Sequence, residues 1–215
     1  MKKTSILFLL FITIAPVFAQ SNWSIVPGKI ASAFAEQVNV AQPHSEYPRP
    51  QMERKNWMNL NGLWKYTILP TTYQSFPASY EGNILVPFAV ESALSGVGRT
   101  VGKDSVLWYE RSIAVPSSLR NGNVLLHFGA VDWKCDVFVN GKAVGTHEGG
   151  YDPFTFDITS ALKKGAAQNI VVRVWDPSDQ GPQPAGKQVR IPRTIWYTPV
   201  TGIWQTVWLE GVPNT

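Results

Sequence analysis

The sequence predicts an all-β fold, an antiparallel jelly-roll β-sandwich, and three observations support this prediction. From residue 56 onward, short runs of alternating apolar and polar residues follow one another, separated by glycine, proline and asparagine. Two such runs flank Asn140-Gly141, and an Asn-Gly pair in this setting is the strongest short-range hairpin signal. No segment has a sustained helical periodicity, and nine Trp, seven Tyr and ten Phe suit the core of a sandwich.

The first nineteen residues are expected to be a signal peptide and not part of the fold. Lys2 and Lys3 precede an apolar run over residues 6–14, and Val-Phe-Ala at 17–19 places a small residue at the cleavage position. The apolar run is short for a membrane span, although an uncleaved anchor remains the alternative. We therefore expect an exported, periplasmic or secreted chain that has no membrane attachment after cleavage.

Residues 20–45 are expected to form an extended lead-in, because AQPHSEYPRP at 41–50 contains three prolines and no sustained pattern. A short helix over residues 30–40 is the exception. The folded domain is predicted to cover residues 46–212, and residues 213–215 would begin a linker. Within the domain we expect strands at 63–68, 83–87, 106–115, 123–130, 133–139, 154–157, 169–176 and 203–210.

Two of these strands show their buried face clearly. In 106–115, one face carries Leu107, Tyr109, Arg111, Ile113 and Val115. An arginine on an apolar face is interpreted as a structural ion pair or as a side chain that reaches solvent at the edge of the sandwich.

The strand before Asn140-Gly141 places Trp133, Cys135, Val137 and Val139 on one face. Cys135 is the only cysteine of the chain, so no intrachain disulfide can form. We interpret it as a small buried hydrophobic residue and not as a nucleophile.

Residues 154–165 are expected to continue from their strand into one or two helical turns that end at Gly165. The turn before that strand, HEGGYDP at 147–153, is interpreted as a tight connection with local capping bonds.

Residues 177–202 contain five prolines and are predicted to form a long surface loop. Basic and aromatic side chains near the end of this loop favour a functional role, since long loops in compact domains are usually functional or disordered.

The last predicted strand, 203–210, has apolar bulk on both faces. Ile203, Val207 and Leu209 lie on one face, while Trp204 and Trp208 lie on the other. One face is expected to enter the core. The tryptophan face is either an interface, since two exposed tryptophans would form a sticky patch, or it is covered by the 177–202 loop or by the lead-in.

Composition excludes several classes of function. Without Lys2 and Lys3 the chain has 17 basic residues against 15 acidic ones, with no basic cluster, so no nucleic-acid partner is expected. The three histidines have no metal-ligand spacing, and we expect neither a metal nor another cofactor. The sequence contains no G-x-S-x-G elbow, no phosphate loop and no H-E-x-x-H. No catalytic residue is assigned.

Four segments together resemble the amino-terminal sugar-binding domain of glycoside hydrolase family 2, a galactose-binding-domain-like jelly roll. They are NWMNLNGLWKY (56–66), LWYERSIAVP (107–116), LHFGAVDWKCDVFVNGKAVGTHEGGYDPFTFDIT (126–159) and TGIWQTVWLE (201–210). The family contains β-galactosidases, β-glucuronidases and β-mannosidases. In full-length members an immunoglobulin-like domain and a (β/α)₈ barrel follow, and the barrel carries both catalytic Glu residues.

The resemblance implies glycosidase ancestry without a catalytic centre in this chain. The acid/base Glu of the family lies in an Asn-Glu pair, and none of the eight Glu residues here follows an Asn. We therefore expect a carbohydrate-binding fragment of a secreted β-glycosidase, with hydrolysis of O-glycosidic bonds performed by a barrel that is absent from these residues. Its partners would be a β-linked glycoside and the missing immunoglobulin-like and barrel domains. The alternatives are a free-standing, non-catalytic carbohydrate-binding protein and a purely structural interaction domain.

The resemblance also suggests the carbohydrate-binding residues. Some family members use an acid six positions before the Gly of the closing S/A-G-I motif, and here Trp196 stands at that position. We expect Trp196 and Tyr197 to offer a stacking surface, with Arg193 beside them and Glu91 reaching the same pocket.

Overall fold

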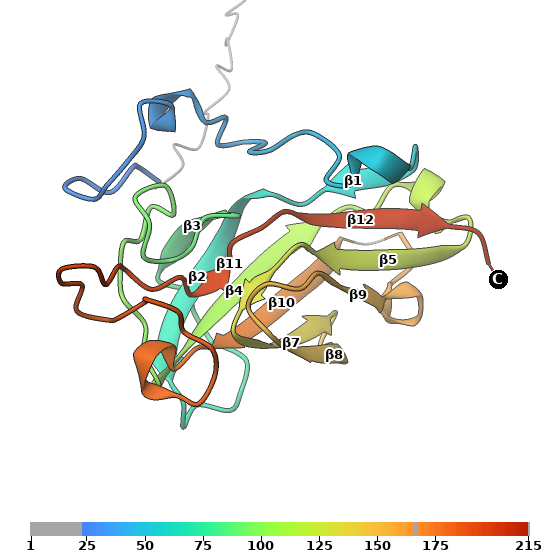
Figure 1. The fold of residues 1–215 in the computed structure, drawn as a ribbon. Coiled ribbons are helices and arrows are strands. Elements are labelled where there is room, and N and C mark those ends of the chain that lie inside the picture. Colours follow the sequence, from blue (N-terminus) through green and yellow to red (C-terminus); the bar gives the residue numbers. More distant parts are fainter. Residues whose placement is uncertain (1–22, 166, 215) are drawn as a thin grey trace, which may run out of the picture.

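A computed structural model describes residues 23–165 and 167–214 (Figure 1). The predicted signal peptide, residues 1–19, lies outside the described residues. The described chain forms two antiparallel sheets that face each other, which confirms the predicted all-β sandwich. Among the described residues, no helix is both long and apolar enough to span a membrane.

One sheet has the strand order β1-β12-β5-β9, and the other has the order β3-β2-β4-β10-β7-β8. A short pair, β11-β6, joins the two layers at one end. The strands are β1 (Trp57–Asn59), β2 (Gly62–Pro70), β3 (Gly82–Val86), β4 (Ser105–Ile113), β5 (Asn123–Phe128), β6 (Val131–Asp132), β7 (Lys134–Val139), β8 (Lys142–Glu148), β9 (Phe154–Asp157), β10 (Gln168–Trp175), β11 (Gly202–Ile203) and β12 (Val207–Val212). Short 3₁₀ helices are η1 (Ala35–Gln37), η2 (Pro50–Met52), η3 (Ser117–Arg120), η4 (Thr159–Ala161) and η5 (Ser178–Gln180).

The core lies between the two sheets and is built from the inward-facing positions of their strands. Alternation predicts these positions, because successive side chains of a strand point to opposite faces. The fully buried side chains include Leu107, Tyr109, Leu126, Phe128, Cys135, Val137, Val139, Ile170, Val172, Val207 and Leu209. Cys135 is therefore a buried hydrophobic residue, as expected, and its burial raises the pKa of the thiol to about 12.

The predicted hairpin is present. β7 and β8 pair antiparallel, and Asn140 and Gly141 between them both have positive φ, at 53° and 80°. These angles fit a type I′ turn, which Asn-Gly favours. The strand itself begins one residue later than predicted, at Lys134, so Trp133 stands outside it.

Arg111 keeps the predicted position on the inner face of β4, but it forms no ion pair in the described structure. Its Nη1 atom donates to the backbone oxygen of Asn61 at 2.8 Å and also to that of Leu60, and its guanidinium lies 5.9 Å from the centre of the Trp64 ring. The expected ion pair is therefore wrong. Burial lowers the pKa of Arg111, and the two carbonyl oxygens accept from its Nη1 donors.

The predicted last strand, 203–210, is wrong as a continuous element. It is interrupted at residues 204–206, so that β11 pairs with β6 while β12 pairs with β1 and β5. Gly202 permits the close approach before the break, since a Cβ atom there would clash with the Tyr109 hydroxyl oxygen. Across the break, the backbone still bonds to the connection between β5 and β6, since Gly129 N donates to Thr206 O at 2.9 Å.

The segment before β1 covers residues 23–56 in the structure, extends past the predicted end of the lead-in at residue 45, and is called the lead-in from here on. It runs along one edge of the sandwich (Figure 1). The helix expected over residues 30–40 is reduced to the single 3₁₀ turn of η1, and the flanking residues are mostly exposed. Further along, Tyr47 is buried against the four-stranded sheet. The lead-in therefore contributes to the fold mainly through its second half.

Candidate functional site

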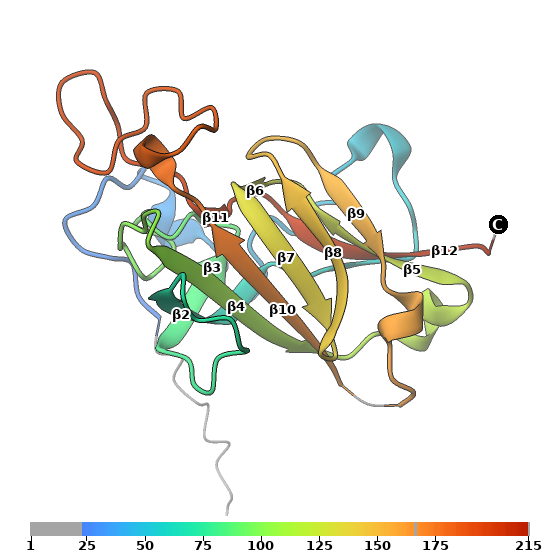
Figure 2. The same ribbon diagram turned by 90° about the horizontal axis from the view of Figure 1, so that it is seen from below.

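Three irregular segments gather at one end of the sandwich, away from the end where β12 stops (Figures 1 and 2). They are the start of the lead-in, the connection over residues 87–104 and the loop over residues 177–201. Backbone bonds tie them together: Val26 N donates to Ala93 O at 3.0 Å, and Val90 N donates to Thr201 O at 3.2 Å.

Glu91 anchors this end of the fold. Its side chain is 2% exposed, and its Oε2 accepts a hydrogen bond from the backbone N–H of Thr201 at 3.0 Å. Its Oε1 has no hydrogen-bond partner among the described residues. Burial raises the pKa of Glu91 to about 8, although the bonds from Thr201 lower it in part. Glu91 is therefore a protonated structural carboxyl group near neutral pH.

Two more acids lie in the same region. Asp176 Oδ2 accepts from the Thr201 hydroxyl at 2.7 Å, and burial raises the pKa of Asp176. Burial also raises the pKa of Asp132 to about 7, and the neighbouring charge of Asp176 adds to the increase. Both acids are largely buried, and Asp176 holds the end of the loop through Thr201.

The loop itself folds back as a narrow hairpin-like projection. Val189 N donates to Tyr197 O at 2.9 Å, Tyr197 N donates to Lys187 O at 3.0 Å, and Trp196 N donates to Arg193 O at 2.8 Å. Four large apolar side chains of this projection are exposed: Ile191, Ile195, Trp196 and Tyr197. We call this set the apolar loop tip.

The structure separates the four residues proposed for carbohydrate binding. Trp196 is 38% exposed, Tyr197 is 53% exposed, and Arg193 is also on the surface. Glu91 is 2% exposed and accepts a hydrogen bond from Thr201 N, so in this structure it offers almost no surface to a sugar. The binding roles of all four residues remain predictions, and Glu91 is the one of the four that is buried.

A groove of about 610 Å³ opens elsewhere, between the lead-in and the break that separates β11 from β12. Its aromatic side chains are Tyr151 and Trp204, with Trp208 and Tyr47 deeper in the wall. The polar side chains that line it are His44, Glu46, Arg49, Gln205 and Thr206. Sequence reasoning found the aromatic face of the last strand, but it did not find this groove.

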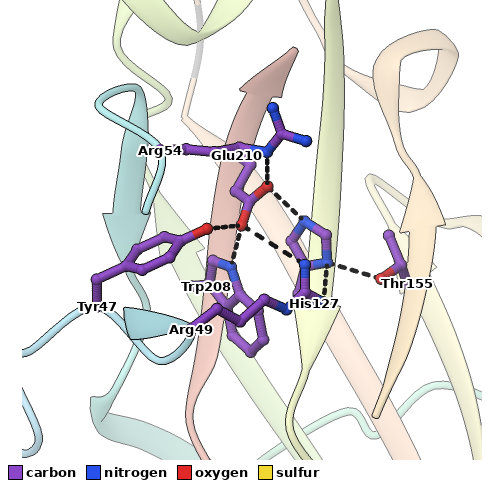
Figure 3. Close-up of polar contacts among 7 residues, drawn as sticks. All are labelled: Tyr47, Arg49, Arg54, His127, Thr155, Trp208 and Glu210. Carbon is purple, nitrogen blue, oxygen red and sulfur yellow. Dashed lines mark hydrogen bonds and ion pairs between the residues drawn. The ribbon is translucent and has the colours of Figure 1, made fainter. Parts of the chain in front are cut away.

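Glu210 joins the lead-in to the sheet beneath the groove (Figure 3). The carboxylate is 1% exposed. Its Oε1 accepts from the Tyr47 hydroxyl at 2.6 Å and from Trp208 Nε1 at 2.8 Å, while Arg54 Nε lies 2.8 Å from its Oε2. Arg49 is more distant, with Nη1 at 3.9 Å from Oε1. The lead-in thus fastens to β12 through one buried carboxylate.

His127 on β5 completes this network. Its ring stacks on Trp208 with centroids 4.8 Å apart, and its Nδ1 is 2.7 Å from Thr155 Oγ1. Burial lowers the pKa of His127 to about 4, against the opposing effect of the Glu210 charge. Burial alone would raise the pKa of Glu210, but the hydrogen bonds from Tyr47 and Trp208 and the nearby positive charges outweigh it, and the pKa is lowered.

The two tryptophans of the predicted last strand have different surroundings. Trp208 is 2% exposed, because the lead-in covers it and the Arg49 guanidinium lies 4.9 Å from its ring centre. The cover of Trp208 therefore comes from the amino-terminal side, as one of the expected alternatives had it, but from a residue beyond the predicted end of the lead-in at residue 45. Trp204 is only partly covered, and it turns toward Tyr151 at the rim of the groove.

The groove has features of a binding site and lacks those of a hydrolytic one. Glycoside hydrolysis uses two carboxyl groups that flank the scissile bond. Glu46 is the only carboxylic acid among the described side chains that line the groove. No group of three or more His, Cys, Asp or Glu side chains in the described ranges is arranged to hold a metal ion.

Comparison with known protein families identifies a family that matches this chain. The family described as "Glycosyl hydrolases family 2, sugar binding domain" matches residues 70–210. A β-galactosidase from Thermoanaerobacter pseudethanolicus is 35% identical over 111 residues, which cover 51% of this chain and 14% of that protein. A β-glucuronidase from Felis catus is 31% identical over 135 residues, which cover 55% of this chain and 20% of the relative. The chain therefore spans about a seventh to a fifth of the length of these relatives.

Solved structures share the fold. Bacteroides uniformis β-glucuronidase 2, covalently bound to cyclophellitol-6-carboxylate aziridine, superposes with a TM-score of 0.55 at 26% identity, over 74% of this chain and 18% of that one. A β-glucuronidase from Ruminococcus gnavus in complex with D-glucuronic acid superposes with a TM-score of 0.55 at 24% identity, over 78% of this chain and 31% of that one.

Proposed function

Because this chain belongs to glycosyl hydrolase family 2, through the sugar-binding domain of that family, we propose that it is the amino-terminal carbohydrate-binding sandwich of a β-glycosidase. The family match over residues 70–210 is the observation that carries the proposal. The relatives are β-galactosidases and β-glucuronidases, which supports a β-linked pyranoside as the ligand class.

The apolar loop tip supports a role beside other domains. Clusters of exposed apolar side chains mark interaction sites or ligand grooves, and rigid loops at one end of a scaffold often carry them. The loop tip is held by backbone bonds within the loop, and the buried Glu91 fixes the end of the loop at Thr201. We propose that Trp196 and Tyr197 form one wall of a sugar site and that an immunoglobulin-like domain and a catalytic barrel complete it.

Hydrolysis itself is assigned to that barrel and not to these residues. No Glu of the sequence follows an Asn, and the groove is lined by a single acid. The full chain is therefore expected to release no nitrophenol from 4-nitrophenyl β-galactoside or 4-nitrophenyl β-glucuronide. Hydrolysis that disappears in Glu46→Gln would contradict this assignment.

The proposed role of Trp196 in the wall of the sugar site is tested by Trp196→Ala in a polypeptide that contains both this domain and the catalytic barrel. The expected result is a several-fold rise in KM with little change in kcat, since the lost contact binds substrate and transition state equally. Met52→Ala is a matched control, because Met52 is a large exposed apolar side chain on η2, outside the loop. Kinetics that Trp196→Ala leaves unchanged would refute the role of the loop.

We also propose that the protein is exported. Lys2, Lys3 and the apolar residues 6–14 support this, together with the small residue at position 19. Amino-terminal sequencing of protein recovered from the periplasm or the medium is expected to begin at Gln20. Recovery only from the cytoplasm with Met1 in place would refute export.

A further inference from the structure

The groove between the lead-in and residues 204–206 has the size and lining of a small-molecule site. Its volume of about 610 Å³ falls within the range of about 300–1,000 Å³ that is typical of ligand pockets. Such pockets combine apolar or aromatic walls with a few convergent polar groups. Nothing in the family assignment accounts for this lining.

The aromatic wall is fixed in place. Trp204 Nε1 donates to Gly150 O at 2.8 Å, which ties the break between β11 and β12 to the turn before β9. Gly150 also packs closely against Asp132, since a Cβ atom there would lie 2.7 Å from Asp132 Oδ1. Tyr151 meets Trp204 edge to face, with centroids 6.0 Å apart and an interplanar angle of 78°.

This geometry leaves Tyr151 available to a ligand. The side chain is 60% exposed although it lies against a fixed partner ring. Tyrosine provides a large contact surface at low entropic cost, since it has only two side-chain torsions to order. A flat ring with one exposed face suits the apolar C–H face of a pyranose.

The polar rim provides hydrogen-bond donors and acceptors. Arg49 is about half exposed, and its contacts with Glu210 (3.9 Å) and His127 (3.5 Å) are longer than a good hydrogen bond. Its five N–H donors are therefore only weakly engaged. Glu46 and Gln205 line the same groove and are exposed, so their oxygens can accept from sugar hydroxyl groups.

The groove is also organised before any ligand arrives. Its floor includes Trp208, which the His127 ring, the Arg49 guanidinium and a hydrogen bond to Glu210 hold from three sides. The Glu210 carboxylate binds Tyr47 and Arg54 of the lead-in at the same time. The floor of the groove therefore needs little rearrangement when a ligand enters.

We infer that this groove binds a pyranoside on the chain itself, with the sugar ring stacked on Tyr151 and its hydroxyl groups bonded to Arg49 and Glu46. The inference rests on the proposed carbohydrate-binding function and adds a site that is separate from the apolar loop tip. It does not require the barrel, so the chain alone is expected to bind sugar.

Saturation-transfer difference NMR on the full chain tests this site, with methyl β-D-galactopyranoside and methyl β-D-glucuronide as probes. At least one probe is expected to receive saturation at its ring protons, and Tyr151→Ala is expected to weaken binding about three- to tenfold. Because Tyr151 is exposed, its replacement leaves the core intact. Phe34→Ala is the matched control, since Phe34 is 69% exposed and does not line the groove, and it is expected to bind like the unchanged chain.

Two outcomes would overturn the inference: no saturation transfer to either probe, or binding that Tyr151→Ala leaves unchanged. A difference between the two probes shows whether the carboxylate of the glucuronide contributes through Arg49. The proposed function fails separately, by unchanged KM in Trp196→Ala. Trp196→Ala therefore tests the proposed function, and Tyr151→Ala tests the groove.

Discussion

Replacing Glu91 by glutamine is predicted to change how the stability of the domain depends on pH. Glutamine has the same shape, and its side-chain oxygen can still accept the hydrogen bond from Thr201 N, which Glu91 accepts at 3.0 Å. It has no proton to lose. The variant therefore removes the titration of Glu91 while it keeps the contact that anchors the end of the loop.

Whether the free energy of unfolding rises or falls with pH follows from the direction in which burial shifts the pKa of Glu91. Burial raises the pKa of Glu91 to about 8 in the folded chain, whereas an unfolded Glu titrates near 4.5. Between these values the folded state holds a proton that the unfolded state has lost, so the free energy of unfolding falls as pH rises from about 4.5 to about 8. A tenfold change in proton affinity corresponds to about 1.4 kcal/mol, so the difference between the folded and unfolded pKa values sets an upper limit of about 5 kcal/mol.

Urea unfolding of both proteins at pH 5 and pH 8 measures this difference. We expect similar stability at pH 5 and a variant that is about 2–5 kcal/mol more stable at pH 8. The comparison removes the effect of titrating groups that do not interact with Glu91, whereas Asp176, whose charge raises the pKa of Glu91, contributes to the difference as part of the same buried cluster. An equal stability difference at the two pH values would refute the claim that Glu91 is protonated in the folded chain.

Two further predictions concern buried polar contacts, and both use urea unfolding at pH 7. Tyr47→Phe removes one donor to the buried Glu210 carboxylate and should cost about 1–3 kcal/mol; a change below about 0.5 kcal/mol would mean that the Tyr47–Glu210 hydrogen bond contributes little to stability. Arg111→Leu leaves the carbonyl oxygens of Leu60 and Asn61 without this donor and should cost about 2–4 kcal/mol; a neutral effect would show that water replaces the guanidinium.

The sequence predicts the regular part of the fold well, because the signals are local. Alternation identifies the buried face of β4 and β7, and the hairpin at Asn140-Gly141 follows from the φ preferences of those two residues. The burial of Cys135 follows from the same alternation. These features depend on neighbours a few residues apart.

The sequence fails where the structure is decided by distant partners. The break at residues 204–206 depends on the bond from Trp204 to Gly150, 54 residues away, and no local pattern reveals it. The Tyr47–Glu210 hydrogen bond joins residues 163 apart. The Arg49 guanidinium over Trp208 also comes from a distant part of the chain, so alternation alone left the cover of Trp208 undecided.

The sequence predicts only part of the candidate site, because the rest depends on contacts between residues that are distant in sequence. Trp196 and Tyr197 are exposed, as a proline-rich loop suggests, but the burial of Glu91 comes from contacts with Thr201 across the fold. The groove combines the lead-in, the turn at Tyr151 and the strand break. Each of these three segments can be recognised in the sequence, but the sequence does not show that they lie side by side in the fold.

The central claim is that this chain binds a carbohydrate, and the indole N–H signals of its tryptophans test it most directly. In a titration of the ¹⁵N-labelled full chain with methyl β-D-galactopyranoside and then methyl β-D-glucuronide, we predict a saturable shift of the Trp204 signal. The signal of the buried Trp64 should stay in place, because its Nε1 donates to Leu60 O in the core. A titration in which the Trp204 signal does not move with either sugar would contradict the claim.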